Sequence, residues 1–277
     1  MKIKKIYKKM YYGLLKRNFR YISSPFRMLP DFIIIGAVRC GTTSLYYNIC
    51  EHPQILSASY DEIGFFDVNY DLGINWYRSM FPIKSRDISS EKYLTGEDTP
   101  FYFWNESTAK KIKKDLPNVK LITILRNPVD RAYSNYNLGV RGGTENLSFE
   151  EAIDIEINAL EKIEITRGNL VNLCTNPRSY IIKSLYYEQM KIWTENISKD
   201  NLFVTNTEMM LEKPENVLEN IFKFLQISPY KIKNPQKRKN VQYLDMSNKT
   251  RKKLIEFFKP HNQQLYKLIG HEFKWDI

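Results

Sequence analysis

The chain has 277 residues, of which 43% are hydrophobic and 26% charged, with a formal net charge of +11. This composition is ordinary for a soluble globular protein and provides enough apolar residues for a full core. No stretch of about 18 consecutive apolar residues occurs, so no membrane-spanning helix is predicted.

The positive charge is concentrated near the two ends of the chain. Residues 1–30 carry nine Lys/Arg and no acid, and residues 231–267 carry eleven against two acids. The body between them, residues 31–230, is mildly acidic, with 21 basic and 27 acidic groups. A nucleic-acid-binding protein more often spreads its basic surface through the fold. We therefore predict no nucleic-acid partner.

The cysteines and histidines predict neither a disulfide framework nor a metal site. The three cysteines, Cys40, Cys50 and Cys174, form no C-x-x-C pair, and the three histidines are dispersed along the chain. Scattered cysteines in odd number argue against a disulfide-stabilised fold and indicate a reducing, cytoplasm-like compartment. Dispersed histidines do not match the spacing of zinc ligands.

The N-terminal arm, residues 1–30, has the pattern of a basic amphipathic helix. Apolar residues from Ile3 to Leu15 recur on one helical face, and lysines fill the other. Such a helix is typical of peripheral contact with an anionic membrane. The same pattern also fits a helix docked on the body of the protein. The arm has no apolar block long enough for a signal peptide.

Apolar runs and helical patterns alternate over the rest of the chain, residues 31–277. The strand-like runs are 32–35, 120–125 and 201–205, and the helical patterns are a run from about Thr43, then 107–115, 129–140, 148–166, 178–196, 214–225 and 247–268. Strands separated by helices predict a mainly parallel sheet covered on both faces. With no repeat and no low-complexity linker, the pattern favours a single α/β domain.

A loop that resembles a phosphate-binding loop follows the first predicted strand. In "FIIIGAVRCGTTSLYYNI", residues 32–49, Gly36 and Gly41 have the spacing of G-x-x-x-x-G-K-[ST], but Thr42 stands in the lysine position. A strand that leads through a glycine turn into a helix directs backbone N–H groups at an anion. Arg39 adds a positive charge. Because nucleotide triphosphates need the loop lysine and Mg²⁺, the loop favours a ligand with fewer phosphates than ATP. A purely structural strand–helix corner is the alternative.

A second anion site is predicted at the end of the strand 120–125. In "LITILRNPVDRAYSNYNLGVRGG", Arg126 lies at the carboxyl end of the strand, where ligands collect in open α/β sheets. Pro128 suits the first turn of a helix, and Ser134 follows about two turns after Arg126. Two such sites in one sheet predict a ligand with two separated phosphates.

These residues lead to a family resemblance. The segments "IIIGAVRCGTTSLYYNICEHPQI" and "LRNPVDRAYSNYNLGVRGGTENLSFEEAI" resemble sulfotransferases that use 3′-phosphoadenosine 5′-phosphosulfate (PAPS), and are most similar to the heparan-sulfate-like carbohydrate branch. The resemblance extends from about Asp31 to Trp275. It implies PAPS as the cofactor, no metal, and sulfuryl transfer to a carbohydrate or glycolipid acceptor.

The resemblance also implies roles for individual residues around the cofactor. The first loop would hold the 5′-phosphosulfate through Arg39, Cys40, Gly41, Thr42, Thr43 and Ser44. Arg126 and Ser134 would hold the 3′-phosphate, and Ser184 and Tyr186 match positions near the adenine and that phosphate. Lys237, Arg238 and Lys239 would lie in a loop that covers the nucleotide, although such a charge run also fits a solvated face. Arg39 replaces the lysine that is usual in the family. We expect its planar, positively charged guanidinium to take the role of that lysine.

The acceptor side is implied by two further segments. Glu62 in "SYDEIGFFD" matches the family's general base, and partial burial would raise its pKa for that task. Asp61 and Gly64 replace a usual lysine and a frequent histidine. In "TGEDTPFYFW", Glu97 is a candidate second acid or substrate contact, and Tyr102 and Trp104 are candidates for stacking on sugar rings. A surface carboxylate and core aromatics are the alternatives.

The sequence thus predicts a PAPS-dependent sulfotransferase with direct in-line transfer, Glu62 as base and Arg39 on the leaving phosphate. It predicts a cytoplasmic enzyme, and for the arm it leaves two alternatives, peripheral membrane contact and docking on the body of the protein. The alternatives are a small-molecule kinase with a phosphate-binding loop, which the missing lysine disfavours, and a non-catalytic membrane-associated binding module. The acceptor and the oligomeric state are not determined by the sequence.

Overall fold

The structure is a computed structural model that describes residues 20–84, 93–233, 235 and 245–275. The basic arm up to residue 19 and the three basic residues Lys237, Arg238 and Lys239 lie outside the described residues. Predictions about these segments therefore stay predictions.

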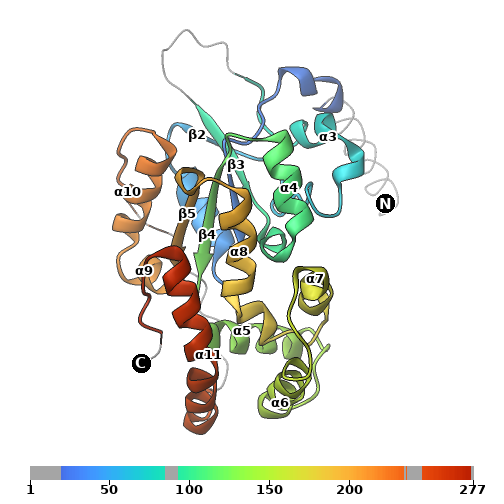
Figure 1. The fold of residues 1–277 in the computed structure, drawn as a ribbon. Helices are drawn as coiled ribbons and strands as arrows, with labels where there is room; N and C mark the ends of the chain where they lie inside the picture. The colour runs from blue at the N-terminus through green and yellow to red at the C-terminus, as the bar shows by residue number, and fades with distance from the viewer. Residues whose placement is uncertain (1–19, 85–92, 234, 236–244, 276–277) are drawn as a thin grey trace, which may run out of the picture.

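A five-stranded parallel sheet forms the centre of the molecule (Figure 1). Its strands are β1 (Phe32–Gly36), β2 (Ile55–Ser57), β3 (Leu94–Asp98), β4 (Lys120–Leu125) and β5 (Leu202–Asn206). They lie in the order β2-β3-β1-β4-β5, and all four pairings are parallel. The carboxyl ends of β1, β3 and β4 therefore lie side by side at one edge, as the sequence analysis requires for a shared site.

Helices cover both faces of this sheet (Figure 1). The α-helices of the described residues are α2 (Thr42–Cys50), α3 (Ile74–Arg78), α4 (Glu106–Asp115), α5 (Pro128–Arg141), α6 (Phe149–Leu160), α7 (Arg167–Thr175), α8 (Tyr186–Asn196), α9 (Thr207–Glu212), α10 (Pro214–Leu225) and α11 (Asn248–Ile269). Helix α8 lies between α4 and α11 on one face. On the other face, the end of α2 meets α10, where the rings of His52 and Phe222 are 4.7 Å apart.

The strand sequences explain why the sheet is buried. β1 reads FIIIG, and each of its residues is buried, as expected for a central parallel strand covered on both faces. Phe32 packs on β3 at Gly96, where a Cβ would lie 2.4 Å from the ring. This close approach requires glycine at that position, and it favours the observed register of β3 against β1, in which Phe32 pairs with Gly96.

The predicted single α/β domain with a mainly parallel sheet is confirmed. The sequence analysis missed β2 and β3, and also α3, α7 and α9. The predicted helix 148–166 ends at Leu160, and the predicted helix 178–196 begins only at Tyr186, after a short 3₁₀ helix, η4 (Ile182–Ser184). The chain from Asn176 to Leu185 thus turns several times, where the predicted helix 178–196 would already have begun.

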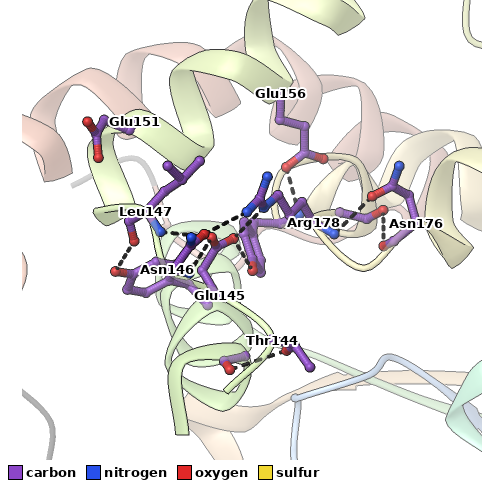
Figure 2. A network of polar contacts seen from close by, with 12 residues as sticks. Thr144, Glu145, Asn146, Leu147, Glu151, Glu156, Asn176 and Arg178 are labelled. Atoms are coloured by element: carbon purple, nitrogen blue, oxygen red, sulfur yellow. Dashed lines mark hydrogen bonds and ion pairs between the residues drawn. The ribbon is translucent and has the colours of Figure 1, made fainter. Parts of the chain in front are cut away.

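A polar network holds that turning segment in place (Figure 2). Glu145, buried after α5, accepts hydrogen bonds from Arg178 Nε at 3.1 Å and from the Tyr180 hydroxyl at 2.9 Å. Glu156 of α6 accepts the backbone N–H groups of residues 180, 181 and 182 at 2.6–2.9 Å. Carboxylates that accept several backbone N–H groups fix a loop firmly. The network therefore positions η4 and the start of α8 against α5.

Candidate functional site

The loop between β1 and α2 has the geometry of an anion-binding turn. Arg39 and Gly41 adopt left-handed backbone conformations, with φ of 69° and 91°, and Gly41 is the N-cap of α2. The first turn of a helix leaves N–H groups without intrahelical partners and carries the positive end of the helix dipole. Thr42, Thr43 and Ser44 provide hydroxyl groups in that turn. The predicted residues are thus gathered where an anion is favoured.

The second predicted anion site adjoins the first. Arg126 directly follows β4, which is paired with β1, and Ser134 is buried on α5. A guanidinium nitrogen of Arg39 donates a hydrogen bond to Ser134 Oγ at 3.3 Å. Nη1 of Arg126 is buried and has no hydrogen-bond partner among the described residues. A buried guanidinium N–H without a partner is costly, so this position suits an incoming anion.

Helix α5 begins where the sequence predicted it. Asn127 is the N-cap, and its side chain accepts the N–H of Val129 at 3.0 Å, with Pro128 in the first turn. This cap turns the chain sharply after Arg126. Ser134 on the helix contacts Arg39 of the loop, and the charge of Arg126 is near enough to Cys40 of the loop to act on the pKa of its thiol.

Two hydroxyl groups connect the loop to the end of β4. Thr207 Oγ1 lies 2.6 Å from the carbonyl oxygen of Cys40 and 2.9 Å from that of Leu125. The Tyr186 hydroxyl donates to the Arg126 carbonyl at 2.9 Å and lies 3.6 Å from Cys40 Sγ. Burial raises the pKa of Cys40 to about 11, so this thiol stays neutral. The sequence analysis did not single out Thr207, although its place directly after β5 was a usable signal.

Ser184 and Tyr186 are buried and bonded to the protein. Ser184 Oγ accepts Arg131 Nε at 2.5 Å and lies 3.0 Å from the Pro128 carbonyl oxygen. Arg131 itself is fully buried, and it also donates to the Tyr180 carbonyl. In this arrangement Ser184 and Tyr186 hold the walls of the second anion site in place. The proposed contact of these two residues with a nucleotide stays a prediction.

Glu62 lies in the wall of a cavity of about 380 Å³. Other lining residues are Arg20, Tyr60, Asp61, Asn69 and Trp76. The pKa of Glu62 is raised, first by partial burial and then by the negative charge of Asp61. Glu62 also adopts a left-handed conformation, with φ of 48°, and its N–H donates to the Asp98 carbonyl at 3.1 Å. A non-glycine residue held in this way is a frequent feature of functional sites.

Glu97, Tyr102 and Trp104 occupy the core. Glu97 is 0% exposed, and its carboxylate accepts from Tyr77 at 2.5 Å, Thr99 at 2.7 Å and Tyr102 at 3.3 Å. Desolvation raises its pKa to about 7. The rings of Tyr102 and Trp104 are buried, so in this structure neither presents a face to a sugar. The exposed aromatic ring of the segment is that of Phe101. Substrate contact by these three residues would require this segment to open.

Asp98, next in the strand, was not singled out from the sequence. Successive residues of a strand face opposite sides of the sheet, so Asp98 lies on the side of α2, close to Thr43. It is 0% exposed. Desolvation, followed by the charges of Asp61, Glu97 and Glu62, raises its pKa to about 8. Its only sequence signal was its position at the end of a strand that the sequence analysis missed.

The site can therefore hold an anion with two charged groups beside a carboxylate-lined cavity. No cluster of three or more His, Cys, Asp or Glu residues with metal-binding geometry occurs within the described ranges. The sulfotransferase domain family matches residues 29–272. The chain belongs to the sulfotransferase family. The residues of its two predicted anion sites, its cavity and the whole central sheet fall within the matched range.

Relatives and a solved structure agree with this assignment. The chain is 29% identical to "Membrane-associated sulfotransferase kil1" of Dictyostelium discoideum, over 89% of this chain and 66% of that protein. It is 28% identical to "Bifunctional heparan sulfate N-deacetylase/N-sulfotransferase 2" of Homo sapiens, over 87% of this chain and 30% of that enzyme. The chain thus spans about two thirds of the first relative and less than a third of the second.

The fold is shared with a crystal structure of a sulfotransferase from Alicyclobacillus acidocaldarius. The TM-score is 0.69 at 26% identity, covering 90% of this chain and all of that chain. This match supports the arrangement of the parallel sheet and its flanking helices. Within the part of this sulfotransferase that the structure describes, no helix combines the length and apolar character needed to cross a bilayer.

Proposed function

We propose that this sulfotransferase transfers a sulfuryl group from PAPS to a hydroxyl or amino group of a carbohydrate or glycolipid acceptor. The observation that carries the proposal is the hydrogen bond between Arg39 of the loop and Ser134 of α5, 3.3 Å long. It joins two anion sites at the ends of neighbouring parallel strands, as a nucleotide with phosphates at both its 5′ and 3′ positions requires.

The residues present fit this donor. The start of α2 with Thr42, Thr43 and Ser44 suits the 5′-phosphosulfate, and Arg126, whose buried Nη1 has no described partner, suits the 3′-phosphate. When bound, PAPS supplies an activated sulfuryl group whose leaving group is adenosine 3′,5′-bisphosphate. Arg39 and the loop N–H groups would stabilise the charge that develops on the leaving phosphate. Ser134 would keep the Arg39 side chain and the ribose phosphate in register.

Glu62 is the residue suited to accept the acceptor's proton. It lies in the cavity wall and its pKa is raised, which brings a carboxylate closer to the basicity that proton removal needs. The proton would pass from the acceptor hydroxyl or ammonium group to a Glu62 carboxylate oxygen as the sulfuryl group moves in line. The polar atoms Trp76 Nε1 and Arg20 Nη1 are buried without described partners, and both residues line the same cavity. They are available to a polar acceptor such as a sugar.

Calorimetric titration with adenosine 3′,5′-bisphosphate, and separately with ATP and Mg²⁺, tests the choice of donor. We expect the bisphosphate to bind at least about tenfold more tightly than ATP, and Arg126→Ala to weaken that binding by about 10–100-fold. Arg141→Ala, an exposed arginine at the far end of α5, is the matched control. Tighter binding of ATP would reject the proposed donor.

A screen with radiolabelled PAPS tests the acceptor class. The acceptors are hexosamine oligosaccharides with free amino groups, the same oligosaccharides N-acetylated, and simple glycolipids. We expect label in at least one of them, and none with Glu62→Gln under the same conditions. Transfer only to non-carbohydrate acceptors would overturn the acceptor part of the proposal and leave the donor part standing.

A further inference from the structure

A buried carboxylic acid that the proposed mechanism does not use lies between the phosphate loop and Glu62. Asp98 ends β3 and is 0% exposed. Its carbonyl oxygen accepts the N–H of Glu62 at 3.1 Å, and its carboxyl group lies near the hydroxyl of Thr43 in the first turn of α2. Asp98 therefore adjoins both the residue assigned to proton removal and the helix start assigned to the donor phosphate.

The surroundings of this carboxyl group do not favour a negative charge. Neither of its oxygens makes a hydrogen bond of normal geometry to a described residue, although Thr43 is close enough to lower the pKa slightly. Titratable groups near it are Asp61 and Glu62 in the cavity wall, Glu97 on its own strand, and Tyr46, Tyr47 and Cys50 on α2. All of these groups are acids or weak acids. A buried carboxyl group surrounded by other acids is costly to ionise. Burial, followed by the charges of the neighbouring acids, therefore raises the pKa of Asp98 to about 8.

An ionised carboxylate at this position would also repel the ligand of the loop. The start of α2 is the place where the proposed function puts a phosphosulfate, and a like charge beside it would weaken binding. A neutral carboxylic acid removes the repulsion and provides an O–H donor for an oxygen of the anion. The bound anion in turn favours the protonated acid, because the two sites are thermodynamically linked.

We propose, building on the donor and base assigned above, that Asp98 acts as a neutral acid that donates a hydrogen bond to an oxygen of the anionic group held at the start of α2. The cluster would then contain two carboxyl groups with opposite tasks. Glu62, which is partly buried but still accessible to solvent, is ionised and accepts a proton, while Asp98, which is fully buried, keeps its proton and donates a hydrogen bond. Different environments set neighbouring carboxyl groups to different protonation states in this way.

Binding of adenosine 3′,5′-bisphosphate measured against pH tests this role without an acceptor. Ionisation of the ligand's phosphates is nearly complete above about pH 7.5, since their second pKa lies near 6. We expect the Kd of the unmodified protein to rise by about tenfold between pH 7.5 and 9.5, as Asp98 loses its proton. For Asp98→Asn, which is neutral at every pH and keeps an N–H donor, the Kd should change by less than about twofold over that range. Asp98→Ala, which lacks the donor, should bind about 5–20-fold more weakly than Asp98→Asn at pH 7.

Calorimetry in two buffers of different ionisation enthalpy gives a second measurement. At pH 8.5 the unmodified protein should take up a substantial fraction of a proton, at most about one, when the bisphosphate binds. Asp98→Asn should take up much less, and Asp71→Asn, an exposed control in the short 3₁₀ helix Tyr70–Leu72 before α3, should behave like the unmodified protein. Burial also lowers the pKa of Lys183 to about 8, so the comparison with Asp98→Asn is needed to assign a pH-dependent Kd to Asp98. If a variant fails to fold, a pH-independent Kd of the unmodified protein still rejects the proposal.

Three results would overturn the proposal: a pH-independent Kd for the unmodified protein up to pH 9.5, the same pH dependence in Asp98→Asn, or Asp98→Asn binding as weakly as Asp98→Ala at pH 7. Failure of the proposed function would give different binding results. In that case the unmodified protein would prefer ATP, or would not bind the bisphosphate at pH 7, whatever residue stands at position 98.

Discussion

Glu62 combines a strained backbone, partial burial and a like-charged neighbour. A glutamate with φ of 48° is unusual, because left-handed conformations favour glycine or asparagine. The N–H of Glu62 is held by Asp98, and the adjacent Asp61 accepts the Tyr47 hydroxyl at 2.7 Å. Asp61 is thereby fixed close to Glu62, where its charge adds to the effect of burial on the pKa. These contacts together keep a carboxylate of raised basicity at the wall of the cavity.

We predict that Glu62→Gln lowers kcat for sulfuryl transfer by roughly 10²–10⁴-fold. The Kd for adenosine 3′,5′-bisphosphate should change by less than about threefold, because Glu62 is assigned to the acceptor and not to the donor. Since the pKa of Glu62 is raised, the unmodified enzyme should lose activity on the acid side at a pH above the ordinary glutamate range. Stopped assays from pH 4 to 8 measure both effects. Glu51→Gln, an exposed residue after α2, is the control, and an unchanged kcat in Glu62→Gln would reject its role as base.

Substitution of Arg39 tests whether a planar guanidinium group is needed in this loop. Its guanidinium reaches Ser134 on α5 at 3.3 Å, while its backbone lies in the phosphate loop. A lysine at the same position keeps the charge but has only one nitrogen, so it cannot contact Ser134 and a phosphate oxygen with separate groups.

We therefore predict that Arg39→Lys lowers kcat/KM by about 3–30-fold, and that Arg39→Ala lowers it by at least about 100-fold. Ser134→Ala in the Arg39→Lys background should add little, because their contact is already lost. A double-mutant cycle in transfer assays measures this coupling. Full additivity of Arg39→Lys and Ser134→Ala would show that the hydrogen bond between these side chains does not contribute to turnover.

At the scale of secondary structure, the sequence predicted the elements that have continuous apolar runs. β1 and β4 were found for this reason, and with them the loop and Arg126. β3 was missed because its sequence, LTGED, has four residues of small or polar type, yet all five are buried. Glu97 is stabilised there by the hydroxyl groups of Tyr77, Thr99 and Tyr102, and a search for apolar runs does not detect such polar partners. Asp98 was missed with the strand, and the sequence left open whether Tyr102 and Trp104 belong to the core or contact the substrate.

Gly36 joins β1 to the loop under η3 (Pro100–Trp104), and its replacement should displace the loop. A Cβ at Gly36 would lie 2.6 Å from the Cβ of Phe103, which is fully buried and has no room to move. We predict that Gly36→Ala lowers the melting temperature by several degrees and weakens bisphosphate binding by at least about tenfold. Gly168→Ala is the control, because a Cβ there meets only Thr166 Oγ1 at 3.7 Å. Unchanged binding in a folded Gly36→Ala protein would contradict the assigned loop position.

For the whole molecule, the proposed donor site concentrates groups that do not favour the fold when no ligand is bound. Arg126 has a buried N–H without a described partner, and Asp98 has a buried carboxyl group surrounded by other acids. Each of these groups would gain a partner when an anionic ligand binds. Functional sites often contain such locally unfavourable groups, and the rest of the fold compensates for them. Here the compensation comes from the apolar core of the parallel sheet.

The cost of Asp98 to folding should be measurable as a function of pH. Its pKa is raised from 3.8 in the unfolded chain to about 8 in the fold. Below pH 3.8 the group is protonated in both states and costs nothing through ionisation. As the pH rises from there to about 8, the unfolded state releases the proton while the fold retains it, so the free energy of unfolding falls. Above that range the loss is complete and constant.

We therefore predict that Asp98→Asn raises the melting temperature at pH 7–8.5 by at least about 3 °C relative to the unmodified protein. The difference should shrink towards zero as the pH is lowered to 4, because both side chains are then neutral in both states. Thermal melts of ligand-free protein at half-unit pH steps measure the effect, with the exposed Asp71→Asn as control. Saturating bisphosphate at pH 7 should raise the melting temperatures of both proteins by similar amounts, because the fold already retains the Asp98 proton at that pH and Asp98→Asn keeps a hydrogen-bond donor. A destabilised Asp98→Asn at pH 8 would mean that the ionised carboxylate supports the fold, and the neutral-acid role would then be untenable.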